Sequence, residues 1–257
     1  MRIEILILLC IVQGLTEFLP VSSSGHLFLL EKIFGIDNNI LLLNLFFHLA
    51  SLLAVLFFYR KIIFNLIKKP FQPLTYKLII STIITVIIAL LYDYFNFGRY
   101  EYHILGYCFI ITSILLFLTY LFQKNTLSIK TGEISYKNSI LAGIIQGIAV
   151  IPGISRSGST ISSLILSGNT ETESSEYSFL LSIPIIIGGF TYELLKIDNF
   201  TNLFATISPL MLIIAFFITF ITALLALKLT IKLLKNNKFI YFSIYLLILG
   251  LVVIFTL

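Results

Sequence analysis

The chain of 257 residues is 58% hydrophobic and only 11% charged, with a mean hydropathy of +1.05. Soluble domains carry about 25% charged residues, so this composition excludes a soluble fold and indicates a polytopic membrane protein. The net charge of +5 does not indicate nucleic-acid binding, because the basic residues lie between apolar segments. Cys10 and Cys108 both lie within apolar runs, which gives no support for a disulfide framework or a metal cluster.

The first apolar run, residues 3–12, is too short for a helix that crosses a hydrocarbon core, which needs about 20 residues. No small-residue cleavage pattern follows it, so we expect no signal peptide. The next stretch, 13–27, reads QGLTEFLPVSSSGHL. Pro20 disfavours helix before it, the serines after it can cap a new helix, and Gly25 admits a sharp turn. We therefore predict two half-helices that meet at a loop within the membrane, where such backbone must line protein or a cavity.

The stretch 146–160, QGIAVIPGISRSGST, repeats this pattern at an offset of 133 residues. The offset superimposes residues of the same type: Gln13 on Gln146, Gly14 on Gly147, Ser22 on Ser155, Ser24 on Ser157 and Gly25 on Gly158. Pro152, Gly153 and Gly158 are expected to shape the second loop as Pro20 and Gly25 shape the first. The chain is therefore predicted to be one integral membrane domain, residues 1–257, built from repeats of about 1–133 and 134–257.

Three long apolar runs follow each hairpin, and we predict a transmembrane helix in each: 40–59, 76–95, 103–122, 176–195, 205–229 and 239–257. A returning hairpin adds no net crossing, so each half crosses three times and the two halves must be inverted. The predicted fold is an all-α polytopic membrane protein of two inverted repeats, each a re-entrant broken helix hairpin plus three transmembrane helices.

Charge assigns the sides of the membrane. Twelve basic residues fall in the loops 60–77, 123–138 and 228–238, against four on the opposite side. The positive-inside rule makes these loops cytoplasmic. Both termini then lie outside, the first hairpin enters from outside and the second from inside, so that their loops meet near the midplane.

Arg156 is the basic residue that does not lie in a loop. Arginine at that depth costs at least about 2.5 kcal/mol and usually marks a functional site. Its expected partner is Glu17 of the first hairpin or an anionic ligand. The alternative is that Arg156 pairs with Glu17 only to lock the hairpins together.

The polar residues of the two hairpins suit an anion, and phosphate best. Arginine has a planar fork, hydroxyls donate, and half-helix N-termini present free N–H groups. Glu17 and His26 add a metal ligand or base and a nucleophile or proton shuttle, which indicates phosphoryl chemistry. The serines could instead be plain helix caps, and His48 could face the cavity or only bond across the bundle. The predicted phosphate-binding residues are Ser22, Ser24, Ser155, Arg156, Ser157 and Thr160.

Together, Gln13 to His26 and Pro152-Gly-Ile-Ser-Arg156-Ser-Gly-Ser-Thr160 resemble the undecaprenyl-diphosphatases of the bacitracin-resistance type, and the resemblance covers the whole chain. It implies a multi-pass enzyme of the bacterial cytoplasmic (inner) membrane. Such an enzyme hydrolyses undecaprenyl diphosphate, a polyprenyl diphosphate lipid, to undecaprenyl phosphate and inorganic phosphate with a divalent cation, Mg²⁺ or Ca²⁺. The product is the lipid carrier for cell-wall polymers, and the activity confers tolerance to bacitracin, which competes for the diphosphate. A homodimer is compatible with it.

The resemblance also implies roles for individual residues. The family's Glu/Gln-x-x-x-Glu motif falls on Gln13 and Glu17, which are the tentative metal ligands, and its phosphate-binding arginine falls on Arg156. Catalytic roles fall on Glu17, Ser23, His26 and Arg156. Many relatives carry glutamate at the position of Gln13. Because this chain has glutamine there, Glu17 is the only carboxylate of the two loops, which puts in doubt a mechanism that needs a pair of carboxylates. Ser23, His26 and a metal-bound water remain alternatives for the nucleophile, and we expect the site to open to the outer side.

The main rival is a transporter or flippase of a phosphorylated prenyl lipid, because inverted repeats with broken helices are typical of carriers. The concentration of Glu17, His26 and Arg156 at one place argues against it, since a carrier needs only the cation. A second lipid-phosphatase superfamily, with its own Ser-Gly-His element, needs a histidine six residues after the arginine. Ser162 stands there, which excludes it.

Overall fold

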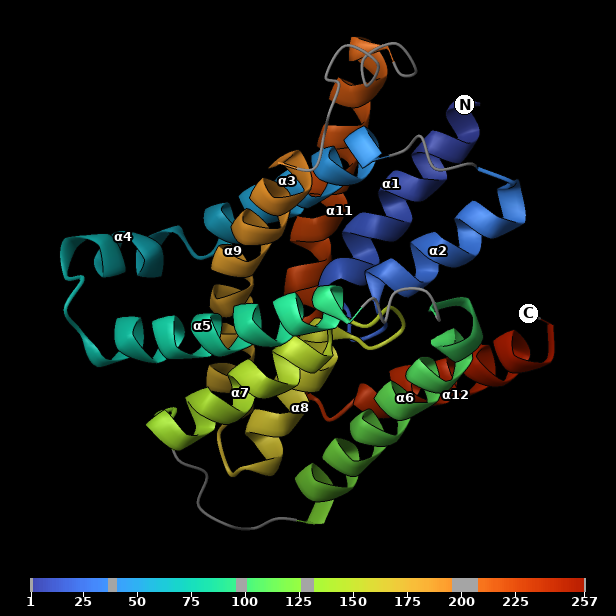
Figure 1. Cartoon of the computed structure of the whole chain (residues 1–257). Coiled ribbons are helices and arrows are strands. Elements are labelled where there is room, and N and C mark those ends of the chain that lie inside the picture. The colour runs from blue at the N-terminus through green and yellow to red at the C-terminus, as the bar shows by residue number, and fades with distance from the viewer. Residues whose placement is uncertain (1, 37–40, 96–100, 126–131, 196–207, 257) are drawn as a thin grey trace.

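The computed structural model describes residues 2–36, 41–95, 101–125, 132–195 and 208–256, and all regular structure in these ranges is helical (Figure 1). This confirms the predicted all-α class. The helices are α1 (Ile3–Phe18), α2 (Ser23–Phe34), α3 (Leu41–Phe58), α4 (Arg60–Lys68), α5 (Pro73–Tyr94), α6 (Glu101–Asn125), α7 (Tyr136–Ile148), α8 (Arg156–Leu166), α9 (Glu171–Leu195), α11 (Pro209–Lys235) and α12 (Phe239–Thr256).

Apart from the nine-residue α4, four of the described helices are too short to cross a membrane, and they form two hairpin pairs. The pair α1 and α2 has 16 and 12 residues, and the pair α7 and α8 has 13 and 11, against the roughly 20 that a crossing needs. The members of each pair contact each other. The breaks fall where the sequence predicts them, because α1 ends before Pro20 and α7 ends before Pro152.

Five helices are long and apolar enough to cross a membrane: α5, α6, α9, α11 and α12. The remaining predicted crossing, 40–59, is α3, an apolar helix of 18 residues. Helix α4 follows it after a bend of 78° at Tyr59. In α4, the adjacent Arg60 and Lys61 are followed by apolar residues such as Phe64, which is 59% exposed. This is the pattern of a helix lying at a membrane surface.

In each half, the first helix of the hairpin packs against a long helix of the other half. Helices α7 and α8 begin 133 residues after α1 and α2, at the offset of the sequence repeat. Helix α1 packs against α11 of the other half, and α7 packs against α5. Close approach rests on glycine in both cases. A Cβ on Gly14 would lie 2.7 Å from the Thr219 carbonyl oxygen, and one on Gly143 would lie 2.7 Å from that of Ser81. This interleaving is consistent with inverted repeats, and their orientation in the membrane stays a prediction.

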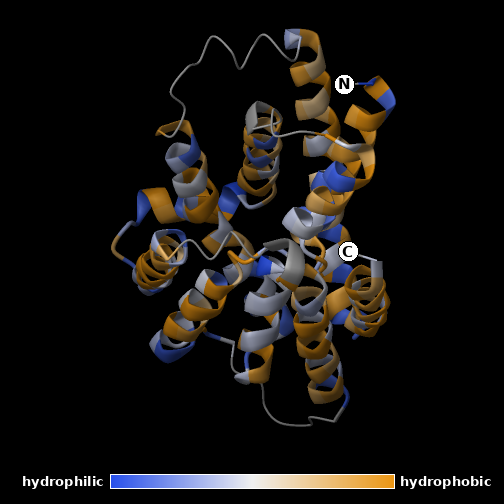
Figure 2. Ribbon diagram, turned by 45° about the vertical axis from the view of Figure 1, so that its right-hand side comes forward, coloured by the Kyte–Doolittle hydropathy of each residue, from blue (hydrophilic) through white to orange (hydrophobic). Residues whose placement is uncertain are grey.

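Apolar side chains cover much of the outside of the bundle, and polar ones gather at its centre. Ile83, Ile87 and Leu90 of α5 are each more than half exposed, as lipid-facing residues are. Figure 2 shows hydrophobic ribbon along the outer helices and paler or hydrophilic ribbon in the middle. The central loops lie in that middle, above a buried cluster that includes Phe18, Phe109 and Phe179.

Candidate active site

The loops of the two hairpins touch at the centre of the molecule (Figure 1). Ser22 Oγ accepts hydrogen bonds from the backbone N–H of Gly25 in its own loop, at 3.3 Å, and of Gly153 in the other, at 3.2 Å. A Cβ on Gly25 would lie 3.1 Å from the Gly153 Cα, so neither loop leaves room for a side chain there. The predicted meeting of the loops is therefore confirmed.

Both hairpins begin their second helix in the same way. Ser22 is the N-cap of α2, and Ser155 is the N-cap of α8, where its Oγ accepts from Gly158 N at 3.1 Å. In each loop the capping hydroxyl also lies 3.4 Å from the serine two residues later, Ser24 or Ser157. The alternative that the serines are helix caps is therefore correct for Ser22 and Ser155. It does not remove them from the site, because capping brings two positive helix N-termini to one place.

The loops differ in where they place a left-handed residue. In the first loop the residue is Ser22, with φ of 70°. In the second it is Gly153, with φ of 92°, while Ser155 has an ordinary φ of −74°. A non-glycine residue in this region costs about 1–3 kcal/mol, and such strain clusters at functional sites.

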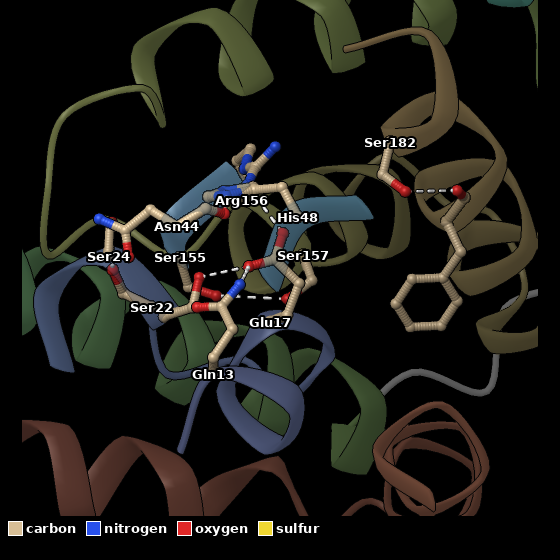
Figure 3. A network of polar contacts seen from close by, with 12 residues as sticks. Gln13, Glu17, Ser22, Ser24, Asn44, His48, Ser155, Arg156, Ser157 and Ser182 are labelled. Carbon is tan, nitrogen blue, oxygen red and sulfur yellow. Dashed lines mark hydrogen bonds and ion pairs between the residues drawn. The ribbon is translucent and has the colours of Figure 1, made fainter. Parts of the chain in front are cut away.

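Glu17 is the central acceptor of the site (Figure 3). Its Oε2 accepts from Gln13 Nε2 at 3.0 Å and from Ser23 Oγ at 2.5 Å, and its Oε1 accepts from an Arg156 N–H at 2.8 Å. The carboxylate side chain is only 3% exposed. A buried carboxylate is stable only when it is paired and hydrogen-bonded, and these three donors meet that need.

Arg156 makes the predicted ion pair across the hairpins. The pair joins the two hairpins, as the alternative of a lock requires, but it does not use the whole side chain. The guanidinium has five N–H donors, and 26% of the Arg156 side chain is exposed. Because one donor serves Glu17, the rest remain for an anion.

A pocket opens between the two loops, and we call it the hairpin pocket. Its polar walls come from the side chains that the sequence singles out: Glu17, Ser22, Ser23, Ser24, Ser155 and Arg156. Ser24 is exposed, whereas the other serines are buried. Hydroxyls, a guanidinium and two helix N-termini around one opening form an anion site.

Two predicted site residues point elsewhere. The His26 ring does not line the hairpin pocket; its Nδ1 donates to the Ser22 carbonyl at 2.8 Å, and its Nε2 lies 2.6 Å from the Tyr245 hydroxyl of α12. Ser23 is bonded to Glu17 and not to His26, so it does not orient the imidazole. The Thr160 hydroxyl donates to the Arg156 carbonyl at 2.8 Å and is fully buried. In this arrangement His26 and Thr160 support the loops. The catalytic role of His26 and the phosphate-binding role of Thr160 stay predictions.

A second narrow pocket lies on the α9 side of the Glu17–Arg156 pair, and we call it the α9-side pocket. Glu17 and Arg156 line it, as they line the hairpin pocket. Its other polar walls are Gln146, Ser157, Ser178 and Ser182. The α9 serines were not singled out from the sequence. Their spacing of four in an apolar helix, which places both on one face, was the available signal.

Helix α3 also contributes polar groups near the centre. Figure 3 places Asn44 and His48 beside Arg156, and the His48 ring is in electrostatic range of Glu17. His48 Nδ1 donates to the Asn44 carbonyl at 2.7 Å. The sequence left open whether His48 faces the cavity. It lies near the Glu17–Arg156 pair but lines neither pocket.

The fold and this site define a class: a polytopic membrane protein whose centre is built from two short helical hairpins and a buried carboxylate paired with an arginine. A model of the family described as bacitracin resistance protein BacA matches residues 6–252 of the chain. The chain therefore belongs to the BacA family.

Curated relatives support the same assignment. A protein of Carboxydothermus hydrogenoformans named Undecaprenyl-diphosphatase is 37% identical over 250 residues, which cover 96% of this chain and 95% of the relative. Proteins of the same name from Halothermothrix orenii and Methanococcus maripaludis are 35% and 36% identical, over 99% and 93% of this chain and 98% and 94% of each relative. The predicted family and the predicted enzyme class, a phosphatase, are confirmed.

Proposed function

We propose that the chain hydrolyses undecaprenyl diphosphate to undecaprenyl phosphate and inorganic phosphate. The observation that carries this proposal is the Glu17–Ser23–Arg156 arrangement, in which a buried carboxylate, a serine hydroxyl and a partly exposed guanidinium meet between two helix N-termini. The names of the relatives support the choice of substrate.

Binding follows from charge. The diphosphate carries negative oxygens that match the free donors of Arg156 and the positive ends of α2 and α8. The hydroxyl of Ser24 is the exposed one at the rim of the hairpin pocket. The prenyl tail stays in lipid, which the apolar outer faces of the bundle permit without special residues.

Ser23 is the group best placed to attack phosphorus. Its hydroxyl already donates to Glu17 Oε2, which is the geometry of a nucleophile beside its general base. In the proposed first step, a bond forms between Ser23 Oγ and the terminal phosphorus while the bridging P–O bond breaks. Glu17 takes the hydroxyl proton, and undecaprenyl phosphate leaves. In the second step a water oxygen attacks phosphorus while the Oγ–P bond breaks. Glu17 returns its proton to Oγ, and inorganic phosphate leaves with one hydrogen of the water while the other is released as a proton.

Arg156 supplies electrostatic stabilisation in both steps. Most catalysis of phosphoryl transfer comes from positioning and from charge held against the equatorial oxygens. The Arg156 guanidinium can turn from Glu17 towards these oxygens when the diphosphate enters, since the side chain is partly exposed.

The side-chain oxygens at the site could bind a divalent cation only if the substrate supplied some of the metal ligands. Among the described residues no group of three His, Cys, Asp or Glu side chains could hold a metal alone. Gln13 Oε1, however, is buried without a hydrogen-bond partner in the described residues, next to Glu17. Mg²⁺ is commonly held by one or two carboxylates plus substrate phosphates. Glu17 and Gln13 would hold it, and it would neutralise charge on the diphosphate.

We further propose that the enzyme lies in the bacterial cytoplasmic membrane with its site open to the outer side, as the charge of the loops indicates. There it would return the lipid carrier to cell-wall synthesis. It would also confer tolerance to bacitracin, because the antibiotic binds the same diphosphate.

The test is phosphate release from a C55 or shorter prenyl diphosphate by detergent-purified protein, with and without EDTA, beside Arg156→Ala. We expect metal-dependent release that falls about 10³-fold in the variant, as for other arginines that act on phosphoryl groups. Full activity in Arg156→Ala would remove the arginine from the mechanism. No release from folded wild-type protein with metal present would favour the flippase, because the interleaved halves of this chain are also typical of carriers. Lipid translocation would then be measured.

A further inference from the structure

The α9-side pocket contains a buried donor that no group in the described part of the chain uses. Gln146 is 2% exposed, and its Nε2 has no hydrogen-bond partner among the described residues. Leaving such a donor unpaired costs about 1–3 kcal/mol. A group of this kind in a native protein indicates a missing partner.

The sequence repeat shows why Gln146 has no partner of the kind that Gln13 has. Its counterpart Gln13 donates to Glu17, four residues later. The offset of 133 places Val150 at the position of Glu17, and valine accepts nothing. The Gln146 amide faces instead the pocket that Glu17 and Arg156 line from the other side.

The walls of this pocket suit an anionic oxygen. Beside Gln146 they carry the hydroxyls of Ser157 and Ser178, and they share Arg156 with the hairpin pocket. Ser157 Oγ bonds only weakly, at 3.3 Å to the Leu19 carbonyl and 3.4 Å to Ser155 Oγ. An amide N–H, hydroxyls and a guanidinium are the donors that bind phosphate oxygens.

The residues that line the α9-side pocket are less exposed than those that line the hairpin pocket. Each residue that lines it is buried or half-buried, whereas Ser24 at the hairpin pocket is exposed. Phe18 and Phe179, whose rings meet edge to face at 5.6 Å, form part of its wall. The prenyl tail needs a path to lipid. The terminal phosphoryl group, which carries no tail, therefore suits the α9-side pocket with its less exposed lining.

We propose that the α9-side pocket is a subsite for an oxygen of the terminal phosphoryl group, the one released as inorganic phosphate, and that Gln146 Nε2 donates to that oxygen. This inference rests on the proposed function. Arg156 then holds the terminal phosphoryl group between the two pockets, with its phosphorus on the side of Ser23 and one of its oxygens in the α9-side pocket.

The test compares product inhibition in detergent-purified full-length protein. The variant Gln146→Met keeps the length of the side chain and removes both amide groups. Gln123→Met is the matched control, because Gln123 lies on α6, bonds to Glu171 and lines neither pocket. Inhibition of hydrolysis by inorganic phosphate and by the prenyl monophosphate is measured separately, together with the melting temperature.

We expect Gln146→Met to raise the inhibition constant of inorganic phosphate about tenfold, as the loss of a hydrogen bond to a charged group predicts. The constant for the prenyl monophosphate should change less than about twofold, and Gln123→Met should change neither. A phosphate constant within about twofold of wild type in a folded variant would overturn the proposal and leave a pocket for water only.

Two further measurements keep the result decisive. If Gln146→Met does not fold, Ser178→Ala removes a donor from the same pocket and should raise the phosphate constant about fivefold, and no change would overturn the proposal. If wild-type protein hydrolyses nothing, the proposed function fails by itself. Calorimetric titration of wild type and Gln146→Met with inorganic phosphate then tests the pocket without turnover: weaker binding in the variant supports it, and equal or no binding overturns it.

Discussion

The two hairpins share a scaffold and divide the chemistry between them. Both begin their second helix at a capping serine that accepts from a glycine three residues later, and both carry a second serine 3.4 Å from the first. The charged groups of the site stand at two positions where the hairpins differ: Glu17 stands against Val150, and Arg156 stands against Ser23. The first hairpin therefore supplies the carboxylate, and the second supplies the cation.

This division teaches why both halves are needed. A duplicated hairpin with two carboxylates at the centre would bury like charges together, and one with two arginines would do the same with positive charge. Opposite charges allow each hairpin to satisfy the other, at 2.8 Å, while the repeat keeps the helix N-termini in register. The following variants break or sharpen this comparison, from the largest expected effect to the smallest.

Ser23→Ala removes the hydroxyl that stands where the second hairpin carries Arg156. We expect kcat for prenyl diphosphate hydrolysis to fall at least about 10³-fold, because Glu17 keeps its other partners but has no nucleophile to activate. Ser163→Ala is the control, since Ser163 is buried on α8, lines neither pocket and should retain activity. Steady-state kinetics decides, and wild-type turnover in Ser23→Ala would assign the attack to another group.

The ion pair itself is tested by a double-mutant cycle. Arg156→Gln should destabilise the protein by about 3–5 kcal/mol, because it leaves Glu17 buried with its charge uncompensated. Glu17→Gln combined with Arg156→Gln should recover most of that free energy of unfolding without recovering activity. Denaturant unfolding in detergent gives the coupling free energy. If the two single variants add without coupling, the pair does not hold the hairpins together.

Gly153→Ala tests the left-handed residue of the second loop. The added Cβ would lie 2.7 Å from Cys108 Cβ and 2.9 Å from the Leu105 carbonyl oxygen, and the φ of 92° would be strained as well. Gly168→Ala is a matched control, with a φ of 90° and open space around it. We expect a loss of about 1 kcal/mol in the control and at least about 2 kcal/mol more in Gly153→Ala. Equal melting temperatures of the two variants would contradict the contact.

Tyr245→Phe tests the histidine that the first hairpin carries and the second does not. It removes the hydroxyl 2.6 Å from His26 Nε2 and keeps the ring stacking at a centroid distance of 5.7 Å. Because His26 lies outside the hairpin pocket, we expect kcat/KM to fall by less than about tenfold, as for the loss of one hydrogen bond. A loss of 10³-fold would instead place the His26–Tyr245 contact in the proton path.

Much of this protein could be predicted from the sequence because the bilayer imposes strong local rules. An apolar run of about ten residues cannot cross, so the re-entrant hairpins were predictable from length alone. Pro20 and the capping serines predicted the breaks, which fall where expected, and the repeat predicted that the loops match. The cost of a charge at membrane depth singled out Glu17 and Arg156 as partners before any geometry was known.

Only the tertiary structure decided which neighbours each polar group has. The sequence placed His26 in the site, but the turn of α2 carries its ring to α12, and Ser23 reaches Glu17 instead. The exchange of α5 and α11 between the halves also left no local signal, because helix packing depends on surfaces far apart in the chain. The unpaired amide of Gln146 is visible only in the folded protein, since a missing partner is a property of a place and not of a residue.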